Sequence, residues 1–111
     1  MTEWLDIGAL DDIPVRGARV LKTGLGCIAV FRTVEDEVFA LEDKCPHRGG
    51  PLSEGIVHGR AVTCPLHNWV IAFDTGTAQG ADEGQVRTFP ARVEKGRVLV
   101  DAALVSKRSA A

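Results

Sequence analysis

The chain has 111 residues, of which 45% are hydrophobic and 25% charged, and its formal net charge is −2. These values predict one globular domain over residues 1–111 with a core that needs no disulfides. The charge argues against nucleic acid or an anionic membrane as a partner, because phosphates attract proteins with a basic excess. No apolar run reaches the ~18 residues of a spanning helix, and the N-terminal residues lack the pattern of a signal peptide, so we expect a cytoplasmic protein with no membrane partner.

Short β-strands separated by turns are predicted along most of the chain. A helical turn is expected at 8–13 and is ended by Pro14. Strands are expected at 19–22, 27–33, 38–42, 61–63, 69–73, 86–89, 92–94 and 97–100. Strand-length segments at this spacing predict an all-β antiparallel sandwich or barrel.

The C-terminal third contains the clearest local signal. The segment "RVEKGRVLV" predicts a tight hairpin around Lys95-Gly96, with Val93, Val98 and Val100 on one face. The turn-rich segment 74–86 is expected to form a surface loop. The tail 102–111 has little to bury and is expected to be frayed.

Two loops between the predicted strands hold one thiol and one imidazole each. Cys45 and His47 lie in "CPHRGGPL", and Cys64 and His67 lie in "CPLHNW". A proline follows each of these cysteines and stiffens the loop just after the thiolate. The chain has three Cys and no export signal, which favours a metal or catalytic site over a disulfide framework.

Three interpretations of this pattern compete. Burial as unrelated core residues suits Cys27, in the apolar segment "GCIAVF", but does not explain matched Cys-then-His pairs in loops. A structural Cys2His2 zinc site has the right number of ligands, but zinc fingers usually keep their cysteines together and their histidines together. A Rieske [2Fe–2S] cluster needs two Cys on one iron and two His on the other, which favours Cys45, His47, Cys64 and His67 as cluster ligands.

The segments "CPHRGGPLSEG" and "CPLHNWVIAFDTG" resemble the two ligand boxes of Rieske [2Fe–2S] proteins, and the similarity runs from Trp4 to Val100. The resemblance implies a Rieske-type β sandwich with a two-loop cluster-binding subdomain at about 45–69. The segments "PLSEGIVHGRAVTCPLHNWVI" and "GADEGQVRTFPARVEKGRV" are typical of the small subunit of assimilatory NAD(P)H-dependent nitrite reductase.

By this resemblance we expect an electron-transfer subunit of nitrite reductase, which converts nitrite to ammonia in nitrate assimilation. The chain has no Gly-rich dinucleotide fingerprint and no second metal constellation, so we expect it not to be catalytic alone. NAD(P)H, flavin and siroheme would lie on a large catalytic partner subunit. The alternative is a free Rieske ferredoxin that supplies an aromatic-ring dioxygenase, and a third interpretation is a structural subunit with zinc or no metal.

The resemblance also bears on the redox potential. High-potential respiratory Rieske proteins carry an extra cysteine in each box, and the two form a disulfide beside the cluster. Gly50 and Leu66 stand at those places here, so we expect a potential at the lower, ferredoxin-like end of the range. We also expect Trp69 to pack beneath the second loop, and His58 to be a solvated turn residue.

Overall fold

A computed structural model describes residues 4–23, 26–44, 51–64, 69–79 and 84–101. Within these residues the chain forms ten β-strands, and the only helices there are two short 3-10 helices, η1 (Leu10–Asp12) and η2 (Leu52–Glu54). No helix in this part of the chain is long and apolar enough to cross a membrane. All the strand pairings between the ten strands are antiparallel, which confirms the expected all-β fold.

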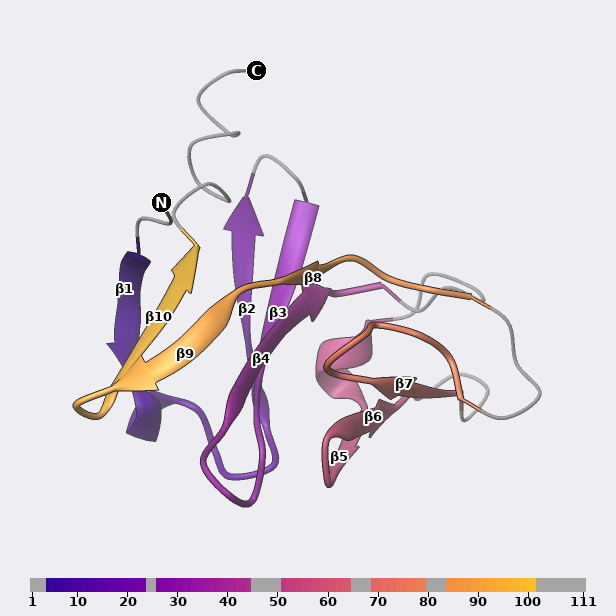
Figure 1. The fold of residues 1–111 in the computed structure, drawn as a ribbon, viewed down its shortest axis with the longest axis horizontal. Coiled ribbons are helices and arrows are strands. Elements are labelled where there is room, and N and C mark those ends of the chain that lie inside the picture. Colours follow the sequence, from indigo (N-terminus) through magenta and orange to yellow (C-terminus); the bar gives the residue numbers. More distant parts are fainter. Residues whose placement is uncertain (1–3, 24–25, 45–50, 65–68, 80–83, 102–111) are drawn as a thin grey trace.

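The strands form three sheets that follow one another across the molecule (Figure 1). The terminal sheet has the order β1 (Trp4–Ala9), β10 (Arg97–Asp101), β9 (Ala91–Glu94). The central sheet has the order β2 (Ala18–Thr23), β3 (Gly26–Arg32), β4 (Val38–Glu42), β8 (Thr88–Phe89). The small sheet has the order β5 (Ile56–His58), β6 (Ala61–Thr63), β7 (Val70–Ala72).

Strand β3 contributes to two apolar clusters, which explains its unbroken apolar sequence. Ile28 and Val30 pack in one cluster with Val98 and other residues of the terminal sheet. Ala29 and Phe31 alternate with them and pack in the other cluster, with residues of the small sheet. A strand covered on both faces reads as a continuous apolar run rather than an alternating one.

The hairpin between β9 and β10 forms as predicted. Glu94 pairs with Arg97, and the two turn residues Lys95 and Gly96 have φ of +51° and +75°. Positive φ at both central residues gives the turn the twist that a two-residue hairpin requires. Val98 and Val100 are buried and Val93 packs against the same cluster, so the expected shared face is confirmed.

Several local expectations need correction. Strands β1 and β5 were not predicted, and β1 is hard to detect because a register shift between Asp6 and Gly8 breaks its alternation. In the segment 74–86, Gly76 and Val86 are buried, so it is not simply a surface loop. The expected helical turn is confirmed as the shorter η1, and the tail 102–111 lies outside the described residues.

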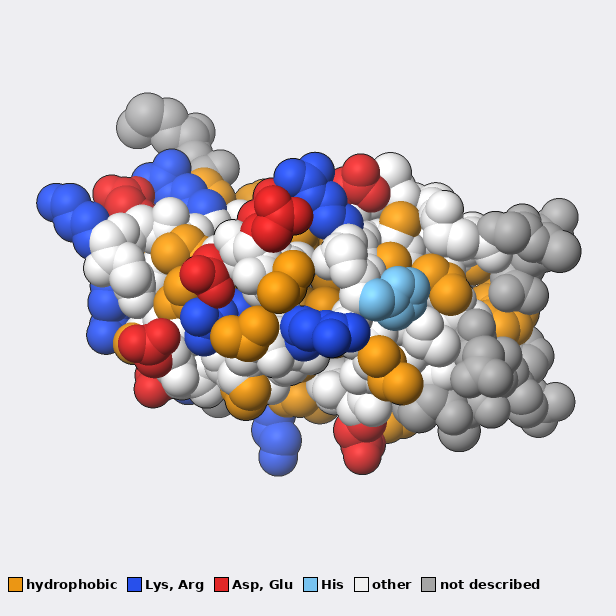
Figure 2. All heavy atoms as spheres, turned by 90° about the horizontal axis from the view of Figure 1, so that it is seen from below, with side chains coloured by type: hydrophobic (Ala, Val, Ile, Leu, Met, Phe, Trp, Pro, Cys, Tyr) orange, Lys and Arg blue, Asp and Glu red, His pale blue; other side chains and the backbone are white. Residues whose placement is uncertain are grey.

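Charged side chains of both signs are interspersed on the face shown in Figure 2. Blue and red groups alternate there with apolar ones, and this face carries no broad patch of one sign. A mixed face of this kind fits the small net charge of −2.

Candidate metal centre

The first ligand loop leaves the central sheet at the end of β4 and returns to η2. Just before the loop, the backbone N–H of Asp43 donates to the carbonyl of Cys27 on β3, at 2.9 Å. The carboxylate of Asp43 then accepts two hydrogen bonds from Ser53 in η2, from its N–H at 2.7 Å and its hydroxyl at 2.8 Å. The carboxylate of Asp43, at one end of the first loop, is therefore hydrogen-bonded to Ser53 at the other end and closes the base of the loop.

The second ligand loop connects β6 to β7 and begins at Cys64. The backbone N–H of Cys64 donates to the carbonyl of Trp69 at 2.7 Å, which closes the base of this loop. Cys64 has no solvent-exposed surface and lies in the apolar cluster that contains Val62 and Ile71. Trp69 is half-buried and packs against the same cluster, as expected for a residue beneath the second loop.

The bases of the two loops lie side by side. Leu52, the first residue of η2, is fully buried in the same cluster as Cys64. Gly55 follows η2 and approaches β6 so closely that a Cβ there would lie 2.3 Å from the carbonyl oxygen of Thr63. Because Thr63 directly precedes Cys64, the return of the first loop packs against the strand that leads into the second.

This arrangement fits the cysteine side of a metal cluster. Cys64 is a buried thiol at the closed base of a loop, where Cys ligands of a cluster are screened from solvent. Cys45, His47 and His67, the other predicted ligands, lie outside the described residues, as do Gly50 and Leu66. The donors offered by the two boxes are two thiolates and two imidazoles, a set suited to iron–sulfur or zinc.

Cys27 and His58 are the third cysteine and the third histidine of the chain, and both lie outside the two ligand boxes. Cys27 is exposed, which corrects the expectation of a core residue, because it stands near the start of β3 ahead of the fully buried stretch that begins at Ile28. His58 is exposed, as expected, but it is the last residue of β5 rather than a turn residue, and its Nε2 lies 2.7 Å from the Thr63 hydroxyl. Sequence reasoning missed Asp43 and Ser53, whose only signal is that short polar side chains flank the loop on both sides.

The small sheet is fastened to the rest of the molecule by polar and aromatic contacts. Arg16 donates through Nε to the carbonyl of Val57 on β5, at 3.0 Å. The ring of Phe73, which follows β7, stacks with Phe31 and Phe39 of the central sheet, with ring centroids 4.8 Å and 5.2 Å apart. The cluster of apolar side chains around Phe73 therefore joins the sheet that carries Cys64 to the central sheet.

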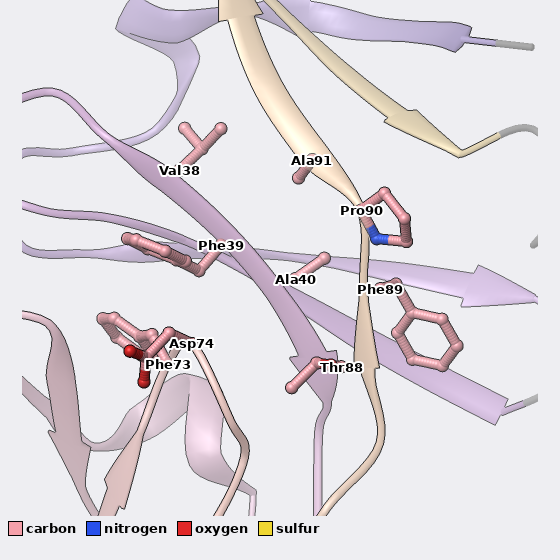
Figure 3. Close-up of a pocket in the computed structure, with 9 residues that line it drawn as sticks. All are labelled: Val38, Phe39, Ala40, Phe73, Asp74, Thr88, Phe89, Pro90 and Ala91. Carbon is pink, nitrogen blue, oxygen red and sulfur yellow. The ribbon is translucent and has the colours of Figure 1, made fainter. Parts of the chain in front are cut away.

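A cleft of about 480 Å³ lies elsewhere, beside β4 (Figure 3). It is lined by residues of β4, of the segment from β8 to β9 and of the turn after β7, among them Phe39, Phe73 and Asp74. None of the loop-base residues described above lines it. The cleft is therefore separate from the described bases of the two ligand loops.

Comparison with known proteins shows the family of the chain. The model of the Rieske-like [2Fe–2S] domain matches residues 3–101. The anthranilate 1,2-dioxygenase ferredoxin subunit of Burkholderia cepacia is 38% identical over 102 residues, which cover 91% of this chain and 94% of that protein.

Two solved structures have similar folds over nearly the whole chain. One is the complex of reduced oxygenase and oxidized ferredoxin in carbazole 1,9a-dioxygenase, with a TM-score of 0.76, 29% identity and coverage of 91% of this chain and 94% of the other. The second is a candidate small subunit of an NADH-dependent nitrite reductase from Mycobacterium tuberculosis, with a TM-score of 0.78, 28% identity and coverage of 90% and 95%. These similarities, together with the buried Cys64, show that the chain belongs to the Rieske-like [2Fe–2S] domain family and is an electron carrier of that family.

Proposed function

We propose that the chain is a Rieske ferredoxin that supplies electrons to the oxygenase of an aromatic-ring dioxygenase, with its cluster held by Cys45, His47, Cys64 and His67. The observation that carries the cluster site is Cys64, which is buried at the closed base of the second loop. When bound, a cluster of this class accepts and releases one electron at a time. The choice of partner rests on the 38% identity to the anthranilate 1,2-dioxygenase ferredoxin subunit.

In this proposal the four ligands divide by depth. Cys45 and Cys64 would hold one iron against the apolar cluster, and His47 and His67 would hold the other iron at the outer edge. Neutral imidazoles at the edge give a contact surface through which a partner could receive the electron. The carbazole dioxygenase ferredoxin, which is 29% identical to this chain, has been seen in complex with its oxygenase and supports this kind of partner.

A second candidate is the small subunit of an assimilatory nitrite reductase. The segments around and after the second box favour it, and so does the fold similarity to the candidate nitrite reductase subunit, with a TM-score of 0.78. In that role the chain would pass electrons within a complex whose large subunit holds flavin, siroheme and the NAD(P)H site. The relatives named as dioxygenase ferredoxins give the first candidate more support than the second.

The cluster part of the proposal is tested by iron analysis, absorption and EPR spectra of the anaerobically purified chain. We expect a Rieske spectrum in the wild-type chain, its loss in Cys64→Ser, and its retention in Cys27→Ser, because the Cys27 thiol is exposed and belongs to neither box. A colourless, EPR-silent chain after reconstitution would contradict the proposal. An unchanged spectrum in Cys64→Ser would contradict the ligand set.

The partner is tested with the reduced, purified protein. Under the first candidate, the chain reoxidises when it is mixed with the oxygenase component of an aromatic-ring dioxygenase, and substrate turnover then depends on its concentration. Under the second, it binds a large siroheme flavoprotein and restores NAD(P)H-dependent nitrite reduction by that subunit. Reoxidation by the reductase large subunit alone would favour the second candidate over the first.

A further inference from the structure

The contact between Asp43 and Ser53 joins two residues on opposite sides of the first box, ten positions apart in the chain. Asp43 follows β4 directly, two residues before Cys45, and Ser53 lies in η2, after the first box. Both carboxylate oxygens are used on this one partner: Oδ1 accepts the Ser53 N–H at 2.7 Å and Oδ2 accepts its hydroxyl at 2.8 Å. These two bonds span the whole loop and form a clamp, unlike the bonds to near neighbours by which Asp and Ser usually cap turns.

Each side of the clamp is fixed independently. On the Asp43 side, its own N–H is bonded to Cys27 of β3, and the preceding Glu42 is bonded through its side chain to the N–H of Arg87 at 2.8 Å. On the Ser53 side, Leu52 is fully buried and Gly55 packs against β6. The clamp therefore adds a direct link between two points that each contact the rest of the fold, and the first ligand loop lies between these points.

We propose that Asp43 and Ser53 are positioning residues that hold the first box ready to bind the cluster. This rests on the ligand set proposed above. The more the two ends of a loop can move relative to each other, the more conformational entropy the loop loses when Cys45 and His47 take up their ligand geometry, and this loss weakens binding. A clamp that orders the ends before binding removes part of that cost, as supporting hydrogen bonds do at other metal sites.

Variants can separate the effect of the two hydrogen bonds on cluster binding from the effect of the Asp43 charge. Ser53→Ala keeps the Asp43 carboxylate but removes the hydroxyl that donates a hydrogen bond to Oδ2. Asp43→Asn removes the charge, yet its amide can accept the Ser53 N–H through oxygen and donate to the Ser53 hydroxyl through nitrogen. Asp43→Ala removes both bonds. If the bonds are what matter, Asp43→Asn should behave like the wild type and Ser53→Ala should not.

The test compares how fast loaded proteins lose their cluster to an iron chelator under anaerobic conditions, followed by visible absorption. We expect Asp43→Ala to lose it about tenfold faster than the wild type or more, and Ser53→Ala by an intermediate factor. Ser53→Thr, which keeps the hydroxyl, and Glu54→Ala, which removes an exposed carboxylate from the same short helix, should match the wild type. We also expect broadened EPR features in Asp43→Ala, a change that lower fold stability alone would not produce.

Three outcomes would overturn the clamp. The first is release at the wild-type rate in both Asp43→Ala and Ser53→Ala. The second is release from Asp43→Asn as fast as from Asp43→Ala, which would assign the effect to charge. If Asp43→Ala does not fold, equal release from Ser53→Ala and Ser53→Thr is the third. A wild-type chain that holds no cluster would instead refute the proposed function, and the clamp with it.

Discussion

Arg60 and Glu37 form a two-bonded ion pair between the small sheet and the central sheet. Arg60 lies in the turn between β5 and β6, and Glu37 immediately precedes β4. The Nε of Arg60 donates to Oε1 of Glu37 at 3.0 Å, and its Nη2 donates to Oε2 at 2.6 Å. The backbone carbonyl of Arg60 also accepts a hydrogen bond from the N–H of Phe73, at 2.8 Å. Arg60 therefore links Glu37 to a residue of the aromatic stack.

Removing this ion pair should weaken the attachment of the small sheet only slightly. The Arg60 side chain is 63% exposed, and ion pairs in such positions are largely screened by water and salt. We expect Glu37→Gln to lower the melting temperature measurably at low salt and hardly at all in high salt. Glu94→Gln is the matched control, because its partner Arg92 lies on the same strand and the pair connects no separate sheets. An equal, salt-independent loss in both variants would contradict this.

A second ion pair should make the stability of the terminal sheet depend on acid pH. Hydrogen bonds from the Arg97 side chain, followed by one from the Gly8 N–H, lower the pKa of Asp6 below its usual 3.8. A carboxylate whose folded-state pKa is depressed stabilises the fold above its unfolded-state pKa and stops doing so as the pH falls through the folded-state pKa. The contribution should therefore be complete above about pH 5 and disappear below the lowered pKa.

This dependence is measured as the difference in melting temperature between the wild type and Asp6→Asn. We expect the wild type to be the more stable protein at neutral pH, and the two curves to converge in strong acid. The comparison cancels acid effects on the cluster that the two proteins share. A difference that stays constant from neutral pH to strong acid would show that the Asp6 charge does not stabilise the fold.

Parts of all three sheets could be predicted from the sequence because their signals are local. The apolar run of β3, the strand β6 ahead of Cys64 and the hairpin at Lys95-Gly96 all lie where the pattern indicates. Strand β1 was missed because its bulge breaks the alternation on which strand prediction depends. The prediction that Cys27 is buried in the core was wrong because an apolar run does not show where the neighbouring sheets stop covering the strand.

The ligand set of the candidate site stays a prediction from the sequence, whereas the contacts that support the two loops could not be predicted. Matched Cys and His residues in two loops are a chemical signal that one sequence can carry, and Cys64 lies buried as such a ligand should. The Asp43–Ser53 contact depends on how close two loop ends come in space. Nothing in the residue types distinguishes it from ordinary loop polarity, so it became visible only in the structure.

The redox potential should lie at the low end of the Rieske range. An oxidised cluster with two thiolates and two neutral imidazoles has no net charge, which makes it easier to reduce than a four-Cys cluster. The resemblance places Gly50 and Leu66 where respiratory members have a disulfide, so the device associated with high potential is missing from this sequence. Potentiometric titration followed by EPR should give a midpoint below about +100 mV, within a class that spans about −150 to +300 mV. A value well above that limit would contradict the ferredoxin-like interpretation.

Gly55 and Gly59 should respond differently to substitution, although both flank β5. Gly55 has an ordinary extended backbone, with φ of −79°, but a Cβ there would lie 2.3 Å from the Thr63 carbonyl oxygen and 2.8 Å from the Val62 side chain. Gly55→Ala should therefore push η2 away from β6 and cost about 1–3 kcal/mol of the free energy of unfolding. Because Thr63 leads into Cys64, the same variant should lose its cluster faster.

Gly59 is the matched control, since glycine is favoured there by the backbone conformation and not by lack of space for a side chain. Its φ is +57°, and nothing lies within 4 Å of the position of a Cβ. Gly59→Asn should be tolerated to within about 1 kcal/mol, because Asn adopts the left-handed conformation more readily than other side chains. Denaturant unfolding of both variants measures the two free energies. A larger loss in Gly59→Asn than in Gly55→Ala would show that the packing of η2 against β6 does not limit stability at this end of the molecule.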